Sequence, residues 1–251
     1  MPDALIAALM MLAAAASAAA APLAGWSPDA DAARDYARQR AGDVSFHVRT
    51  ERKQWGLDPD RTAASASVVK AMLLVAYLNR LDVRRRALQA ADRGLLDPMI
   101  RYSDNDTATA VHNLVGDAGL RQVARRARMK RFAPQPAWGL SLISARDQTR
   151  MWLRFEELVP RRHRAVAMKL LRTIVPQQRW GIGRVRLPDG WKLFFKGGWG
   201  SGTGLVDHQV ALLRRGEERV AMAILTTGNP SHAYGNQTLR GVAKRLLRDL
   251  R

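Results

Sequence analysis

The sequence feature that most constrains the fold is the stretch of residues 68–78, in which Lys70 is the only residue that is not hydrophobic. The stretch is too long for a typical strand, too short to cross a membrane, and apolar on every helical face. A helix of this kind must be surrounded by protein, and a chain of 251 residues with 47% hydrophobic residues is large enough to surround it. We therefore predict a helix that runs, buried, through the middle of a domain.

An uncharged segment stands at the N-terminus. Residues 4–28 carry no charge, and the alanine- and leucine-rich run from Ala4 to Ala21 ends in small residues before Pro22. Such a run is typical of a secretory signal peptide with its cleavage site. We expect residues 1–24 to be a cleaved signal peptide and the mature protein to be secreted or extracytoplasmic. The alternatives are an uncleaved anchor and a disordered tail.

Residues 25–251 are expected to form a single unit, because no repeat or low-complexity linker divides them. In residues 43–49, apolar residues alternate with polar ones, which predicts a half-buried strand. Residues 191–195, 205–213 and 219–227 predict late antiparallel strands, and residues 239–250 a closing helix. From residue 68 to about residue 175 the pattern is helical throughout, including a helix capped by Ser144.

These patterns predict an α+β fold, an antiparallel β-sheet flanked by helices with an inserted all-α lobe. The sheet lobe takes residues 25–64 and 185–251, and the helical lobe takes residues 65–184, with approximate boundaries.

Three short motifs carry the candidate chemistry. Ser67 lies at the start of the buried helix, and Lys70 follows three residues later on the same helical face. The helix dipole and a partly desolvated lysine favour activation of such a serine as a nucleophile, whereas the alternative is an N-cap serine followed by a surface lysine. The second motif, Ser103-Asp104-Asn105, also fits a helix N-cap. The third, Lys196-Gly197-Gly198, places a lysine at the end of a strand whose glycines permit close backbone approach.

In this order the three motifs resemble the S-x-x-K, S-D-N and K-T-G set of class A β-lactamases and the related penicillin-binding D-alanyl-D-alanine peptidases. The resemblance extends over most of residues 28–251 and implies the same α+β fold, without a cofactor. It implies that Ser67 is the acylated nucleophile, Lys70 its proton acceptor or electrostatic activator, and Ser103 the relay to the leaving nitrogen. It further implies that Asn105 holds the substrate amide and that Lys196 attracts the substrate carboxylate. Gly197 and Gly198 would let the strand approach the ligand. The backbone N–H groups of Ser67 and Trp199 would form the oxyanion hole.

Two departures from that set affect the expected activity. Gly197 stands where the K-T-G set has threonine, whose hydroxyl helps to hold the substrate carboxylate; such a hydrogen bond to a charged group is worth about 1.5–3 kcal/mol. Class A β-lactamases also use an omega-loop glutamate for deacylation, and the corresponding span, residues 132–144, holds no acid. Because a base must reach the water that it activates, Asp147, Glu156 and Glu157 are poor substitutes. We expect an acyl-enzyme with a β-lactam or a D-Ala-D-Ala-like amide and slow deacylation, with a D-alanyl-D-alanine carboxypeptidase as the alternative.

The charge balance bears on partners. Lys and Arg number 41 against 22 Asp and Glu, a formal net charge of +19, which attracts polyanions. Basic clusters at residues 84–86, 125–130 and 161–164 fit solvated helix faces, with contact to anionic cell-envelope polymers as the alternative. A second function hypothesis is therefore a non-catalytic polybasic cell-envelope binding protein. The chain has no cysteine, no metal-ligand spacing and no nucleic-acid recognition motif, so we expect no metal and no specific nucleic-acid partner. We also expect a monomer.

Overall fold

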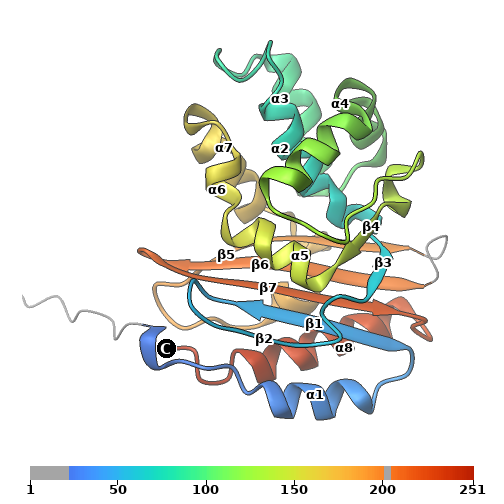
Figure 1. Cartoon of the computed structure of the whole chain (residues 1–251), viewed down its shortest axis with the longest axis vertical. Coiled ribbons are helices and arrows are strands. Elements are labelled where there is room, and N and C mark those ends of the chain that lie inside the picture. Colours follow the sequence, from blue (N-terminus) through green and yellow to red (C-terminus); the bar gives the residue numbers. More distant parts are fainter. Residues whose placement is uncertain (1–22, 201–204) are drawn as a thin grey trace, which may run out of the picture.

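The fold is built on one five-stranded antiparallel sheet. The structure, a computed structural model, describes residues 23–200 and 205–251, so residues 1–22 of the expected signal peptide lie outside the described part of the chain. The sheet forms a central layer with strand order β2-β1-β7-β6-β5 (Figure 1). Helices α1 (Ala30–Arg38) and α8 (His232–Leu246) cover one face of the sheet, and the other helices cover the opposite face.

The strands of this sheet come from both ends of the described chain. β1 pairs with β7 along its whole length, from Asp43 opposite Thr227 to Arg49 opposite Ala221. This pairing confirms that the early and late segments share one antiparallel sheet, and the predicted α+β class is confirmed. The strand bounds are β1 (Asp43–Arg49), β2 (Gln54–Leu57), β5 (Lys192–Gly200), β6 (Val206–Arg215) and β7 (Glu218–Thr227).

The middle of the chain is mostly helical but not entirely so. Two short strands, β3 (Thr62–Ala64) and β4 (Leu142–Ser144), form a separate antiparallel pair, so the expectation of an all-helical middle was wrong at β4. In the described ranges no helix is long and apolar enough to span a bilayer, and no group of three or more His, Asp or Glu side chains is suited to a metal. The remaining helices are α2 (Lys70–Leu78), α3 (Ala90–Asp97), α4 (Asn105–Arg126), α5 (Ala145–Leu153), α6 (Phe155–Leu158) and α7 (Arg164–Arg172).

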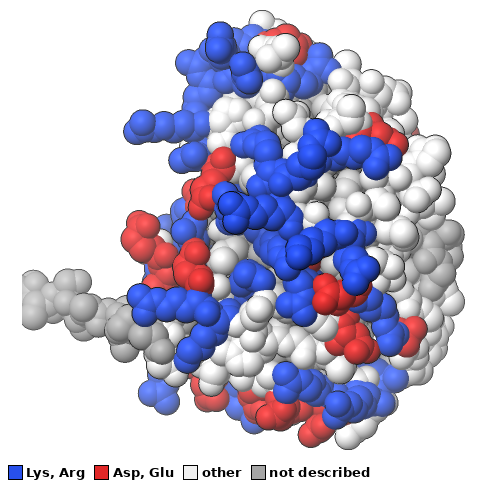
Figure 2. Space-filling model, viewed as in Figure 1, with Lys and Arg blue, Asp and Glu red and all other residues white. Residues whose placement is uncertain are grey.

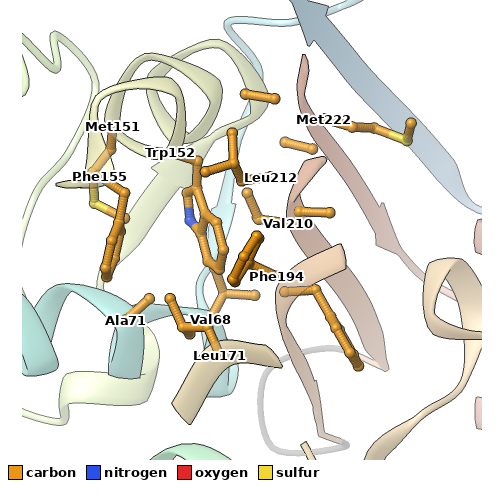
Figure 3. Packing of buried hydrophobic residues seen from close by; sticks show 14 of the residues in the cluster. Val68, Ala71, Met151, Trp152, Phe155, Leu171, Phe194, Val210, Leu212 and Met222 are labelled. Atoms are coloured by element: carbon orange, nitrogen blue, oxygen red, sulfur yellow. The ribbon is translucent and has the colours of Figure 1, made fainter. Parts of the chain in front are cut away.

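The hydrophobic core lies on both faces of the sheet, because its buried residues come from α1 and α8 as well as from the helices on the opposite face. Every residue of α2 is buried, which confirms the buried helix predicted from residues 68–78. Figure 3 shows the indole of Trp152 among side chains of both layers, with Val68 from the turn before α2 and Leu212 from β6 close by. The rings of Trp152 and Phe155 lie 5.6 Å apart, centroid to centroid, and both residues are fully buried. The helical and sheet layers therefore share a single core.

β1 is buried on both faces rather than on one. Ser45 and His47, the polar residues of the alternating pattern, are 3% and 1% exposed. Helix α5 packs on β1 and β7, and its Thr149 Oγ1 lies 2.5 Å from His47 Nδ1. The prediction of a half-buried strand was wrong because the polar face that we assigned to solvent is covered by this helix.

Two C-terminal elements have boundaries that differ from the predicted ones. β5 continues through Lys196 to Gly200, because its pairing with β6 persists from Gly197 opposite Gln209 to Gly200 opposite Val206. Lys196 therefore lies inside a strand and not at its end. Helix α8 begins at His232 instead of residue 239, because Ser231 Oγ accepts a hydrogen bond from the Tyr234 N–H at 3.1 Å and caps the helix there.

Candidate active site

Ser67 lies in the 3-10 turn that leads into α2. The turn spans Ala66–Val69, and Ala66 has a φ of 44°, in the left-handed region that non-glycine residues seldom occupy. Such backbone strain persists only where the surrounding structure holds it, and it is frequent at functional sites. The Ser67 side chain is partly exposed, and its hydroxyl has no hydrogen-bond partner among the described residues. The hydroxyl is therefore open to a substrate.

Lys70, one helical turn further along, is fully buried. Its Nζ donates hydrogen bonds to Asn105 Oδ1 at 2.7 Å and to the Asp104 carbonyl oxygen at 3.0 Å. Burial lowers the pKa of Lys70 to about 7, although the charge of Asp104 acts in the opposite direction. A large fraction of such an amine is neutral at pH 7, so Lys70 is able to accept a proton. The alternative of a surface lysine is wrong.

The hydroxyl of Ser103 lies between two lysine amines. Lys196 Nζ donates to Ser103 Oγ at 2.9 Å, and Lys70 Nζ lies 3.5 Å from the same oxygen. Lys196 is 2% exposed, and burial together with the charge of Lys70 holds its pKa well below the ordinary value. The three groups form a continuous path along which a proton can move.

The segment that carries Ser103 has an unusual backbone. A π-helical turn, Pro98–Tyr102, precedes it, and Ser103 itself has a φ of 63°. Asp104 then caps α4, because its Oδ1 accepts a hydrogen bond from the Thr107 N–H at 2.8 Å. The predicted N-cap is confirmed, and the residues on either side of it, Ser103 and Asn105, are the ones that contact the lysines.

Gly198 allows β5 to lie directly against the turn that holds Ser67. A Cβ atom on Gly198 would stand 2.6 Å from the backbone N of Ser67 and 2.7 Å from that of Val68. Because both neighbours are backbone atoms, neither can move aside, and only glycine fits. Ser67 and Trp199, whose N–H groups are the expected oxyanion donors, thus belong to two segments in direct contact.

An indole fills the space beside Gly197. A Cβ atom on Gly197 would stand 2.8 Å from Cζ2 and 3.0 Å from Cη2 of Trp180. Gln209 fixes the segment of Trp180, because its Nε2 donates to the Trp180 carbonyl oxygen at 2.8 Å and its Oε1 accepts from the Ile182 N–H at 2.5 Å. The indole of Trp180 therefore fills the space that a threonine side chain would take at position 197, the position where the third motif has glycine. The sequence offered no signal for this contact, since no periodicity links residue 180 to residue 197.

A family model described as Beta-lactamase enzyme family matches residues 88–250. The chain belongs to this family. The match includes Ser103 and Lys196, while Ser67 and Lys70 precede it. The protein is thus a β-lactamase-like serine hydrolase. No curated protein sequence matches the chain.

Solved β-lactamases and a penicillin-binding protein have the same fold at low sequence identity. A β-lactamase from Sphaerobacter thermophilus DSM 20745 has a TM-score of 0.76 at 18% identity, over 88% of this chain and 97% of that chain. One from Xanthomonas campestris pv. campestris str. ATCC 33913 has a TM-score of 0.74 at 16% identity, over 87% and 96%. A mutant of PBP-A, solved as an acyl-enzyme complex with penicillin G, has a TM-score of 0.69 at 17% identity, over 88% and 94%.

In this β-lactamase-family chain, part of the acid-free span of residues 132–144 lies over Lys70. The ring centroid of Trp138 is 5.0 Å from Lys70 Nζ, and Trp138 Nε1 donates to Thr109 Oγ1 at 3.2 Å. Ser65 Oγ donates to the carbonyl oxygen of residue 139 at 3.3 Å, which ties the span to the segment before Ser67. The span therefore presents an aromatic ring to Lys70 and no carboxylate. Trp138 was missed from the sequence because no motif marks it.

The three acids considered as replacement bases are held in other interactions. Asp147 is fully buried and accepts two backbone N–H bonds from the loop after α4, at 2.8 and 2.5 Å. Glu156 pairs with Arg214 at 2.7 Å, and Glu157 pairs with Arg154 at 2.9 Å. Each of these carboxylates anchors part of the fold, which agrees with the expectation that none is a good base for deacylation.

Proposed function

We propose that the protein is acylated at Ser67 by a β-lactam or by a D-Ala-D-Ala-like amide. In this step the bond from Ser67 Oγ to the substrate carbonyl carbon forms and the amide C–N bond breaks. Ser67 Oγ and Lys70 Nζ share no hydrogen bond among the described residues, so the step requires the two groups to approach when the substrate binds. The Ser67 proton then passes to the neutral amine of Lys70 and reaches the leaving nitrogen through Ser103. The observation that carries the proposal is the position of Ser103 Oγ, 3.5 Å from Lys70 Nζ and 2.9 Å from Lys196 Nζ.

The remaining residues of the three motifs take binding and positioning roles in this proposal. Asn105 holds the substrate amide. The resemblance assigns Lys196 to the substrate carboxylate, but its two hydrogen bonds go to Ser103 Oγ and to the Gly197 carbonyl oxygen, so we assign it to the proton path instead. The N–H groups of Ser67 and Trp199 form the oxyanion hole, where one donor is worth about 2.7–4 kcal/mol of transition-state stabilisation. Gly198 supports this role, because it brings the two segments into contact.

We further propose that the acyl-enzyme is hydrolysed slowly. Among the described residues, an indole lies over Lys70. The acids that follow the span of residues 132–144 in the sequence are hydrogen-bonded or ion-paired to other parts of the fold. Without a carboxylate to activate water, the ester at Ser67 persists. The solved penicillin G acyl-enzyme of a PBP-A mutant, a protein with this fold, supports a β-lactam as the reagent. The alternative, a D-alanyl-D-alanine carboxypeptidase, uses the same acylation step on a peptide.

A pre-steady-state measurement tests the proposed function. β-Lactam ring opening is followed by absorbance after rapid mixing, with wild-type protein and with Ser67→Ala. We expect a burst equal to the enzyme concentration followed by a slow phase, and no burst with Ser67→Ala. Fast linear turnover without a burst would contradict slow deacylation, and the absence of ring opening by the wild type would contradict the proposed acylation. Release of D-alanine from a D-Ala-D-Ala peptide identifies the carboxypeptidase alternative.

A second proposed property is contact with anionic cell-envelope polymers, in keeping with the proposed location outside the cytoplasm. Four arginines line one hollow beside α7, namely Arg84, Arg85, Arg161 and Arg162, and no described carboxylate pairs with any of them. An unpaired cluster of this kind attracts polyanions without requiring a specific sequence or shape. This surface lies outside the three motifs and is compatible with catalysis at Ser67.

A further inference from the structure

Three aromatic rings lie together next to the proposed acylation site. The rings of Trp199 and His232 are stacked at 4.4 Å and 30°, and those of Trp180 and His232 meet edge to face at 5.4 Å and 83°. Trp199 is 52% exposed and the His232 side chain is 37% exposed. We call these three residues the aromatic cluster. It is open to solvent, and the proposed mechanism uses only the backbone N–H of Trp199.

Two consecutive glycines of β5, Gly197 and Gly198, lie between the aromatic cluster and the turn that holds Ser67. Side chains alternate between the faces of a strand, so Lys196 and Gly198 face Ser67 while Gly197 and Trp199 face the opposite side. Gly198 is in contact with the backbone of Ser67, and Gly197 is in contact with the indole of Trp180. Because β5 is an edge strand, a substrate that lies along its free edge from Ser67 can contact side chains of both faces, including the aromatic cluster.

The charge of the aromatic cluster is not suited to an anion. His232 Nδ1 pairs with Asp207 Oδ1, and Asp207, 2% exposed, also accepts a hydrogen bond from Asn229 Nδ2 at 2.8 Å. While Asp207 is ionised, this pair has a net charge of zero or −1, whichever form the imidazole takes. A net charge of +1 requires both groups to be protonated, and Asp207, whose pKa burial raises to about 6, is mostly ionised at pH 7.

The cations near the aromatic cluster, Lys196 and Arg179, contact other groups. Lys196 donates to Ser103 Oγ and the Gly197 carbonyl oxygen, and its pKa is held low by burial. The Arg179 guanidinium lies over the ring of Phe195, 5.3 Å from its centroid. Among the described residues, no Lys or Arg lies over the indole of Trp180 or of Trp199.

We infer that the aromatic cluster is a substrate subsite for an uncharged planar or apolar group, and that Trp180 sets this preference by filling the space beside Gly197. The inference rests on the proposed acylation of Ser67 and adds the class of substrate. An aromatic wall contributes dispersion and stacking to a neutral group, whereas a carboxylate placed against it loses part of its hydration without gaining a cation.

Two forms of one penicillin test the inference, the free acid and its methyl ester. The second-order rate constant for acylation of Ser67 is measured for each by time-resolved intact mass. We expect the ester to react about ten-fold faster, because the wild-type site offers the free acid no cation in place of the water that its carboxylate loses. A free acid that reacts as fast as the ester, or faster, would overturn the inference while leaving the acylation proposal intact. If neither form acylates Ser67, it is the proposed function that fails.

Variants of the aromatic cluster separate its contribution from general damage. Trp199→Ala keeps the backbone N–H but removes the ring, so we expect acylation by the ester to slow more than acylation by the free acid. Trp180→Ala combined with Gly197→Thr puts a hydroxyl in the space that the indole fills, and the preference should then move toward the free acid. Trp55→Ala is the matched control, since Trp55 lies on β2 at the opposite edge of the sheet and packs on Trp26 at 5.9 Å.

Two results with the variants would also overturn the inference. One is equal loss of acylation in Trp199→Ala and Trp55→Ala. The other is a preference for the free acid that disappears in Arg179→Ala, because this result would make Arg179 the carboxylate partner.

Discussion

At the residue scale, Lys70 and Lys196 are buried without a carboxylate partner in the described structure. A buried lysine that lacks a counter-ion is costly in its charged form, so its environment favours the neutral amine. Carbonyl, amide and hydroxyl oxygens surround the two amines, and these groups accept hydrogen bonds without restoring a negative charge. Burying the two lysines costs folding stability, but it yields a neutral amine that can act as a base at neutral pH.

The pH dependence of acylation follows from Lys70. Its pKa is lowered to about 7, so the neutral form that accepts the Ser67 proton increases as the pH rises through 7. We expect the second-order rate constant for acylation by a β-lactam to rise about ten-fold per pH unit below pH 7 and to level off above it. Lys70→Ala should remove most of the rate together with this pH dependence. A wild-type rate that is constant from pH 5.5 to pH 8 would contradict the role of Lys70.

Gly198 provides a second prediction at this scale. Gly198→Ala forces a methyl group against backbone N atoms at 2.6 and 2.7 Å, so β5 must move away from Ser67. We expect a loss of about 1–3 kcal/mol in the free energy of unfolding and a larger loss of acylation rate. Gly94→Ala is the control: its Cβ would have no atom within 4 Å, and alanine is the better helix former, so stability should stay the same or rise. Equal acylation rates in the two variants would contradict the assigned contact.

At the scale of elements, His208 joins the strand before Ser67 to the main sheet. The backbone N–H of Thr226 donates to His208 Nδ1 at 3.1 Å, so Nδ1 is the acceptor and the proton resides on Nε2. Nε2 then donates to the Ala64 carbonyl oxygen of β3 at 3.0 Å. Burial lowers the pKa of His208 to about 4, which keeps this neutral tautomer in place. His208 is therefore a packing residue that positions the turn of Ser67.

Stability in mild acid depends on two buried histidines and one acid. Burial lowers the pKa of His47 to about 3 and that of His208 to about 4, so only the unfolded chain binds these two protons between pH 6 and pH 4. Burial raises the pKa of Asp207 to about 6, so the folded protein binds one proton that the unfolded chain binds only near pH 4. These three groups give a balance of about one proton in favour of the unfolded chain, and Lys196, whose pKa burial also holds low, adds to it. Stability should therefore fall by at least about 1.4 kcal/mol per pH unit as the pH decreases.

Urea unfolding at pH 7, 6, 5 and 4.5 measures this slope. In His208→Gln the slope should shrink, because one of the two histidine contributions is removed. A free energy of unfolding that is constant or increases from pH 6 to pH 4.5 would contradict the burial of these groups.

The elements also separate what the sequence could predict from what it could not. The buried helix and the shared sheet follow from runs and alternations, and the three motifs give the residues around Ser103, because such patterns are local. β1 was misjudged because α5, about a hundred residues away in the sequence, covers its polar face. Trp138 and Trp180 come from irregular segments that no period or motif marks, and only tertiary packing brings them to Lys70 and Gly197.

At the scale of the whole molecule, the charge is spread over the surface with local clusters. Figure 2 shows Lys and Arg side chains over much of one face, with fewer acidic side chains between them. Several arginines of the described chain are paired with acids, such as Arg61 with Asp58 at 3.0 Å. The unpaired cluster beside α7 should therefore bind a polyanion more strongly than the paired positions do.

Retention on an immobilised sulfated polysaccharide measures this difference. Serine replacement of the unpaired set, Arg84, Arg85, Arg161 and Arg162, should lower the salt concentration needed for elution more than serine replacement of a paired set. The matched paired set is Arg34, Arg38, Arg61 and Arg154. Equal shifts for the two sets would show that net charge alone governs retention and that the hollow is no preferred surface.

The measurement that tests the central claim most directly is intact-mass spectrometry of the mature protein over time with a penicillin, beside Ser67→Ala. We predict that the mass increases by one whole penicillin molecule, that peptide mapping places the adduct on Ser67, that it persists after excess penicillin is removed, and that Ser67→Ala gains nothing. An adduct that forms and clears quickly would contradict slow deacylation. The absence of any adduct or product with several β-lactams, or an adduct on another residue, would contradict Ser67 as the nucleophile.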